Sequence, residues 1–195
     1  MKNTSMLIFS LITLLTTSGC QLIRNTLLGF RDAKEKTEEQ LLRYEKRKGL
    51  QTDNNYYICD SAVFADNLNK ILSDSITYLE VYNRDGFLLP QYDTADCPAP
   101  LSRYLQTICA ETPESHKDLH LNDKMKTLTP FKNNTAAATF NYRDYDYTIV
   151  INWARFIGIF NKKNALTFER LLKEQKDCKI HYFKVTMDPV NISRQ

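Results

Sequence analysis

The five cysteines are the side chains of this 195-residue chain best suited to chemistry, because thiolates act as nucleophiles, metal ligands and disulfide partners. None of them stands in a Cys-x-x-Cys pair, the spacing typical of dithiol redox sites; they are Cys20, Cys59, Cys97, Cys109 and Cys178. The last four allow two disulfides in three pairings. Since Cys97 and Cys109 flank one predicted helix, we expect a bridge between them. Cys59 lies in an apolar strand and is expected to be a buried thiol.

Two histidines, His116 and His120, have the spacing at which a helix would bring both imidazoles to one metal ion. The stretch around them, residues 111–123, is polar and poorly periodic, and no glutamate follows the first histidine as in His-Glu-x-x-His. We therefore expect solvated loop histidines and no metal site. We also expect no cofactor, because the chain has no glycine-rich phosphate loop. His181 falls in a predicted strand, at the edge of the core.

The first twenty residues have the pattern of an export signal. Lys2 supplies a positive charge, residues 6–15 form an apolar run, and small residues lead up to Cys20. A helix that spans a bilayer needs roughly 20 apolar residues, so this run is too short to be one. The sequence Ser18-Gly19-Cys20 after the run resembles the lipobox of bacterial lipoproteins.

The lipoprotein resemblance implies that a signal peptide of residues 1–19 is removed and that Cys20 then carries lipid, including palmitate. Because two or more acyl chains anchor a protein stably, we expect permanent attachment to a membrane facing the periplasm. Gln21 stands where enterobacterial lipoproteins kept in the inner membrane have aspartate, which favours the outer membrane. The alternatives are an ordinary cleaved signal with an incidental cysteine and a short uncleaved anchor.

The composition of the whole chain indicates a folded domain rather than a disordered or nucleic-acid-binding protein. Hydrophobic residues make up 43% of the chain, which is enough for a core. The 26 basic and 23 acidic residues nearly balance, so no nucleic-acid partner is expected. We predict a lipid-anchored tether and helix over residues 20–50 and one domain over residues 51–195.

A capping pattern predicts the helix between the tether and the domain. Thr37, with Gln40 three residues later, fits a capping box, and Gly49 fits the C-terminal cap of a helix over residues 37–48. The apolar stripe of this helix is narrow, so we expect it to lie on the surface of the domain.

From Tyr56 onward the pattern alternates between strands and helices, which predicts an α/β domain. The apolar run at residues 147–153 predicts a buried parallel strand, which forms a βαβ unit with the helix and strand after it. Asp85-Gly86 is a hairpin signal. Residues 110–146 predict loops, apart from a weak strand at residues 135–141. The other expected strands are at 56–59, 76–82, 87–89 and 179–187, and the expected helices follow Asp60, span 101–108 and lie between 161 and 175.

The end of the strand at 147–153 resembles the active-site strand of thioredoxins and of their relatives in the cell envelope. In that family the strand ends in Trp-Ala-x-Trp/Phe, and Cys-Gly-Pro-Cys follows at the start of a helix. Here the sequence is Trp153-Ala154-Arg155-Phe156-Ile157-Gly158-Ile159-Phe160. Gly158 is in register, and Asp188 follows the next strand as an acidic residue does in the family. Both cysteines are replaced, by Ile157 and Phe160.

This resemblance implies a thioredoxin-like mixed sheet that cannot exchange disulfides, because Ile157 and Phe160 carry no thiol. Only residues 189–195 follow the last predicted strand, whereas the family continues with two strands, a cis-proline and a helix. The hairpin at 76–91 and the helix at 101–108 would replace them in a rearranged or permuted order. Ile157, Ile159 and Phe160 would form an apolar patch, suited to burial or to a partner.

These features predict an envelope protein without catalytic residues that binds another envelope protein or a peptide. The contact would be made through Trp153–Phe160 or through the tyrosine-rich turn at residues 141–146, because tyrosine is enriched at interfaces. A thiol–disulfide oxidoreductase that uses displaced cysteines is the alternative enzyme. A third alternative is an accessory lipoprotein whose apolar patch is part of its core.

Overall fold

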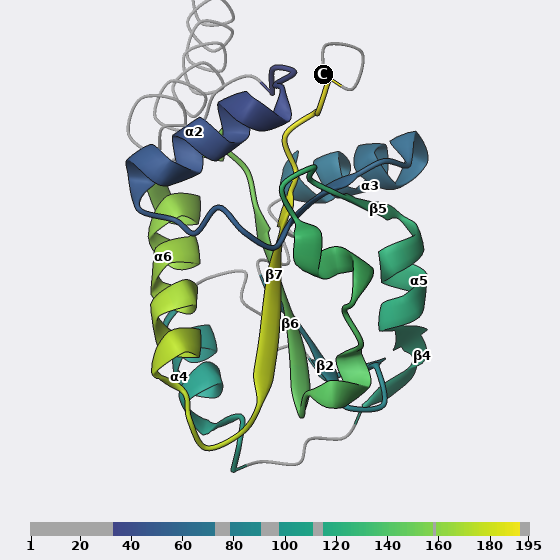
Figure 1. Ribbon diagram of the computed structural model, residues 1–195, viewed down its shortest axis with the longest axis vertical. Helices are drawn as coiled ribbons and strands as arrows, with labels where there is room; N and C mark the ends of the chain where they lie inside the picture. The colour runs from purple at the N-terminus through teal and green to yellow at the C-terminus, as the bar shows by residue number, and fades with distance from the viewer. Residues whose placement is uncertain (1–32, 73–78, 91–97, 111–114, 158, 192–195) are drawn as a thin grey trace, which may run out of the picture.

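A seven-stranded mixed sheet forms the centre of the protein in the computed structural model, which describes residues 33–72, 79–90, 98–110, 115–157 and 159–191 (Figure 1). The strand order is β4-β3-β2-β6-β7-β1-β5. The strands are β1 (Asn55–Ile58), β2 (Leu79–Asn83), β3 (Phe87–Leu88), β4 (His116–His120), β5 (Leu128–Pro130), β6 (Tyr147–Trp153) and β7 (Ile180–Thr186). The helices are α2 (Glu38–Lys48), α3 (Ser61–Leu72), α4 (Pro98–Thr107), α5 (Leu121–Lys126) and α6 (Ile159–Glu174).

Strand β6 lies in the middle of the sheet and sets the direction of its neighbours. It runs parallel to β7, from the pair Tyr147–Ile180 to the pair Trp153–Thr186, and β1 continues parallel on the far side of β7. On its other side β6 pairs antiparallel with β2, which forms the hairpin with β3. The predicted mixed α/β architecture, the βαβ unit and the hairpin are therefore confirmed.

Each face of the sheet is covered by its own layer (Figure 1). Ile149 and Ile151 of β6 pack with residues of α4 and α6, among them Phe168. The intervening Val150 packs on the opposite face with Leu121, the first residue of α5. Because both faces are buried, β6 needs apolar side chains at successive positions, which explains its continuous apolar sequence.

Helix α2 begins and ends as the sequence predicts. The Thr37 hydroxyl accepts from the Gln40 N–H, and the Gln40 side chain accepts from the Thr37 N–H, both at 3.3 Å. Gly49 ends the helix at φ 77°, a left-handed conformation that favours glycine. In Figure 1 the helix lies across the end of the sheet at which β7 finishes.

The prediction of loops over residues 110–146 is wrong. β4 pairs antiparallel with β3, β5 pairs antiparallel with β1, and α5 lies between them in the sequence, so this segment extends the sheet at both edges. These short edge strands gain their partners through backbone hydrogen bonds and bury few side chains, so they show little apolar alternation. The weak strand expected at 135–141 is instead a 3₁₀ helix at Thr135–Ala138.

Candidate functional site

The turn that connects β6 to α6 carries most of the residues singled out from the sequence. β6 ends at Trp153 and α6 begins at Ile159, so the predicted arrangement of strand, turn and helix is present. The next parallel strand, β7, ends beside it, and the Met187 N–H donates to the Trp153 carbonyl at 2.7 Å. The turn therefore lies at the carboxyl end of two parallel strands, where side chains from separate segments converge.

The described side chains of this turn are mostly buried. Trp153 and Ala154 are each 2% exposed, Phe156 is 6% exposed and Ile157 is 0% exposed. Ala154, Phe156 and Ile157 pack against Met187, just beyond β7. Ile157 therefore belongs to the core and contributes nothing to a surface patch. Gly158 and the side chains of Ile159 and Phe160 lie outside the described residues.

Helix α2 covers the outer side of the turn. Leu41 of this helix is fully buried in a cluster with Trp153, Tyr57 and Phe131. The ring of Tyr44 stacks on the Trp153 indole, with centroids 6.1 Å apart and planes inclined by 8°. The helix thus occupies the position from which a partner would have to reach Trp153.

Asp188 joins the turn to the end of β7. Its Oδ2 accepts hydrogen bonds from the Arg155 backbone N–H at 2.7 Å and from the Thr186 hydroxyl at 3.3 Å. Burial raises the pKa of Asp188 to about 6, although its contacts with Arg155 oppose this effect. Because the carboxyl is only 4% exposed and already holds two segments together, its position favours a structural role over acid–base chemistry.

A cluster of buried charges lies where α2, α6 and β7 meet. Lys184 of β7 is 0% exposed, and its Nζ lies 2.7 Å from Glu45 Oε1 and 3.0 Å from Glu169 Oε1. The same Nζ donates to the Gln51 carbonyl, and Glu45 Oε2 accepts from Asn55 Nδ2 at 2.7 Å. One cation thus contacts two buried carboxyl groups and connects α2 to the sheet.

The stability of the protein should fall as pH rises through neutrality, because of Glu45. Burial raises the pKa of Glu45 from 4.5 to about 7, although Lys184 opposes the shift. Between these values the folded state holds a proton that the unfolded state has lost, so folding is favoured at low pH and less favoured above pH 7. We expect the wild type to lose on the order of 1–2 kcal/mol of unfolding free energy between about pH 6 and pH 8.

Urea unfolding of the wild type and of Glu45→Gln at several pH values measures this effect. In the variant, the unfolding free energy should fall much less as pH rises. The smaller fall that remains should come from Asp188, whose raised pKa acts in the same direction at lower pH. Glu39→Gln changes an exposed glutamate of the same helix and should keep the wild-type slope. An equal slope in Glu45→Gln and the wild type would contradict the assignment.

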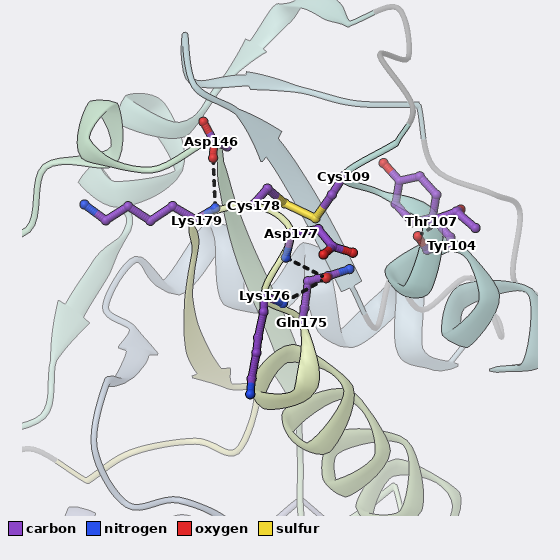
Figure 2. Close-up of a disulfide and its surroundings, with 9 residues drawn as sticks. All are labelled: Tyr104, Thr107, Cys109, Asp146, Gln175, Lys176, Asp177, Cys178 and Lys179. Atoms are coloured by element: carbon purple, nitrogen blue, oxygen red, sulfur yellow. Dashed lines mark hydrogen bonds between the residues drawn. A yellow bond between two sulfur atoms is a disulfide. The ribbon is translucent and has the colours of Figure 1, made fainter.

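The disulfide joins Cys109 to Cys178, with Cα atoms 5.6 Å apart (Figure 2). Cys109 follows α4, and Cys178 lies in the loop between α6 and β7. The expected bridge between Cys97 and Cys109 is therefore wrong, because α4 packs beside α6 and brings Cys109 to this loop. Cys97 lies outside the described residues. In Figure 2 the loop is held by the Gln175 side chain, which accepts from two backbone N–H groups, and by the Lys179 N–H, which donates to Asp146 at 2.8 Å.

A scan against protein-family models, a search of curated proteins and a search of solved structures each found no match. Any functional inference must therefore come from the site itself. Across the part of the chain that the structure describes, no helix has both the length and the apolar character needed to cross a membrane.

The prediction that Cys59 is a buried thiol is also wrong. Cys59 is exposed rather than buried, because β1 ends at Ile58 and the chain then leaves the sheet. Its Sγ lies 3.4 Å from the Thr127 carbonyl oxygen, to which it donates. Within the described ranges it is a free thiol at the surface.

The histidine pair lies on a strand rather than in a loop. His116 and His120 are the two ends of β4, so their Cα atoms are about 13 Å apart at roughly 3.3 Å per residue, too far for one ion. His120 Nδ1 instead accepts from the Asn122 N–H at 3.1 Å and caps α5. No three His, Cys, Asp or Glu side chains gather as a metal site would require in the described segments.

The tyrosine-rich turn is tied to the sheet by aromatic contacts. It forms a 3₁₀ helix at Tyr142–Asp144. Tyr145 packs on His181 and Phe140, with centroids 4.9 and 6.3 Å away. His181 lies in β7 as predicted, and burial lowers its pKa to about 4, so it is neutral in this cluster. Tyr142 and Tyr145 are both half-buried, so this turn exposes less aromatic surface than the sequence suggests.

The cluster of buried charges is the feature of the site that the sequence analysis missed. Glu45 is four residues after Leu41, so it falls on the inward stripe of α2. Lys184 lies between the apolar residues Phe183 and Val185 in β7. A charge at an inward position of each element is a signal for a buried ion pair, although it does not identify the partner.

Proposed function

We propose that the protein is a lipid-anchored lipoprotein of a bacterial envelope whose domain has a rearranged, thioredoxin-like fold without redox activity. In this proposal it works as an accessory factor that binds an envelope protein or a peptide. The membrane anchor is Cys20, and the outer membrane is the expected location.

The order and direction of five strands support the thioredoxin-like assignment. β1, β7 and β6 are neighbours and parallel, and the hairpin of β2 and β3 follows antiparallel on the other side of β6. The hairpin lies where the family's last two strands would be required, although it precedes β6 in the sequence. Helix α4 packs beside α6, as the replacement for the family's last helix would have to do.

The complete burial of Ile157 is the observation that carries the proposal of redox inactivity. A dithiol site needs an exposed thiolate at the start of a helix, and this position holds an apolar side chain buried against Met187. The disulfide of the domain lies elsewhere, at the loop between α6 and β7. None of the residues from Trp153 to Phe160 has a nucleophilic side chain, so this turn is suited to packing or binding rather than to disulfide exchange.

The exposure of Cys59 is the one observation that favours the oxidoreductase alternative. Reduction of a model disulfide substrate, measured with the wild type and with Cys59→Ser, separates the two proposals. We expect both proteins to be as slow as the uncatalysed reaction. Activity in the wild type that is lost in Cys59→Ser would overturn the proposal of a non-catalytic domain.

The Cys109–Cys178 bridge supports export, because disulfides persist in oxidising compartments such as the bacterial periplasm. In cells fed a labelled fatty acid, we expect the wild type to carry label and to sediment with the membranes. Cys20→Ser should lose the label, since the acceptor sulfur is removed. Cys59→Ser removes a cysteine outside the leader and serves as the matched control that keeps the label. Retention of label in Cys20→Ser would contradict lipidation at that residue.

A further inference from the structure

A basic pocket opens between α2 and the turn after β6. It has a volume of about 250 Å³ and is lined by Lys36, Gln40, Arg43, Tyr44, Arg47 and Arg155. Four of these side chains are cations and none is acidic. The volume is below that of typical pockets for drug-sized molecules, so the pocket suits a small anionic group.

The pocket is positive because four cations line it, whereas two of the three acidic side chains of α2 are buried elsewhere. Residues 34–48 contain six basic and four acidic residues, which is close to balance. However, Glu38 is buried and accepts from the Lys132 N–H at 2.9 Å, and Glu45 is buried against Lys184. Glu39 forms an exposed ion pair with Arg43 at 2.8 Å and is the acid of α2 that stays at the surface.

Two of the four cations that line the pocket contact one aromatic ring. The Arg155 guanidinium carbon lies 5.1 Å from the centroid of the Tyr44 ring, and that of Arg47 lies 5.9 Å away. Trp153 stacks on the same tyrosine and fixes its plane. Cation–π contacts therefore pre-organise two guanidinium groups at the pocket wall.

One donor of Arg155, its Nε–H, lacks an acceptor. Its Nε is buried and has no hydrogen-bond partner among the residues that the structure describes. Guanidinium groups present paired N–H donors that match the oxygens of a phosphate. An orphaned donor on a cation that lines a positive pocket points to an oxyanion ligand.

The place of the pocket in the chain indicates where that oxyanion comes from. Lys36 is sixteen residues after Cys20, so the pocket can lie no further than about 55 Å from the acylated residue. Anionic lipids attract basic groups that are held near a membrane surface. We propose that the pocket binds the phosphate of an anionic phospholipid head group in the membrane that holds Cys20. This inference rests on the proposed lipid anchor.

Vesicle binding without the acyl chain tests the pocket alone. The chain from residue 20 onward with Cys20→Ser keeps every described residue and carries no lipid. In about 0.1 M salt it should sediment with vesicles of phosphatidylcholine and phosphatidylglycerol, but not with phosphatidylcholine alone. The triple variant Lys36→Gln/Arg43→Gln/Arg47→Gln should bind on the order of a hundredfold more weakly, at about fivefold for each basic residue.

A second triple variant separates the pocket from overall charge. Lys163→Gln/Lys173→Gln/Lys176→Gln removes the same charge from exposed positions on α6 and beyond it, and should bind within about threefold of the unsubstituted chain. Equal loss in both triple variants, or no binding by the chain with an intact pocket, would overturn the proposal. Equal urea midpoints for the two variants verify that both are folded.

Inorganic phosphate distinguishes a lipid head group from a free ion. At constant ionic strength, phosphate should release no more protein from the vesicles than chloride does. Release by low millimolar phosphate would overturn the assignment to a lipid and would indicate free phosphate as the ligand. A failure of the lipid anchor itself would appear only in the fatty-acid labelling, because the vesicle assay uses a chain without an acyl group.

Discussion

Replacing Lys184 by methionine should destabilise the protein by about 3–5 kcal/mol. The substitution keeps much of the volume of the side chain but removes the charge that lies 2.7 Å from Glu45 and 3.0 Å from Glu169. Two buried carboxyl groups would then face each other without a cation, and burying an unpaired charge is costly. Urea unfolding at neutral pH measures the loss as a lower midpoint with an unchanged slope.

Two further variants show whether the charge itself is responsible. Lys173→Met makes the same change at an exposed position of α6 and should alter stability by no more than about 0.5 kcal/mol. Lys184→Met/Glu45→Leu removes both members of the closest pair and should recover part of the stability, since apolar replacements of buried pairs are often tolerated. If the double variant is no more stable than Lys184→Met alone, packing rather than charge explains the loss.

The elements that the sequence predicts best are those whose signals are local. The capping box of Thr37 and Gln40, the glycine at residue 49 and the apolar run of β6 each lie within one element. The hairpin signal Asp85-Gly86 is also local. Glycine is favoured at residue 86 by its φ of 85° and because a Cβ there would lie 2.7 Å from the His120 ring. Caps and turns require particular residue types at fixed positions, and a buried strand requires a run of apolar residues, so each of these elements can be recognised in the sequence.

The elements that the sequence misses depend on contacts between distant segments. β4 has the sequence His-Lys-Asp-Leu-His, which looks like a loop until β3 provides a backbone partner at the edge of the sheet. Lys184 and Glu45 are 139 residues apart, and neither residue indicates its partner. The burial of Ile157 likewise depends on Met187 and the turn geometry, so the sequence left both burial and exposure open.

Removing the disulfide should cost about 4 kcal/mol in the variant Cys109→Ala/Cys178→Ala. The two cysteines are 69 residues apart, and closing a loop of this length removes much of the conformational freedom of the unfolded chain. The bridge also fixes α4 next to α6, the contact that completes one layer of the core. Urea unfolding of the double variant against the oxidised wild type measures this effect.

Cys59 provides the control because it takes no part in the bridge. Cys59→Ala removes an exposed thiol and should change stability by no more than about 0.5 kcal/mol. Reduced wild type should approach the stability of the double variant, because both lack the same loop closure. If the oxidised wild type and the double variant unfold at the same urea concentration, the bridge does not constrain the unfolded chain. The docking of α4 on α6 would then have to come from apolar contacts alone, those of Tyr104, Leu105 and Ile108 with Phe168, Leu171 and Leu172.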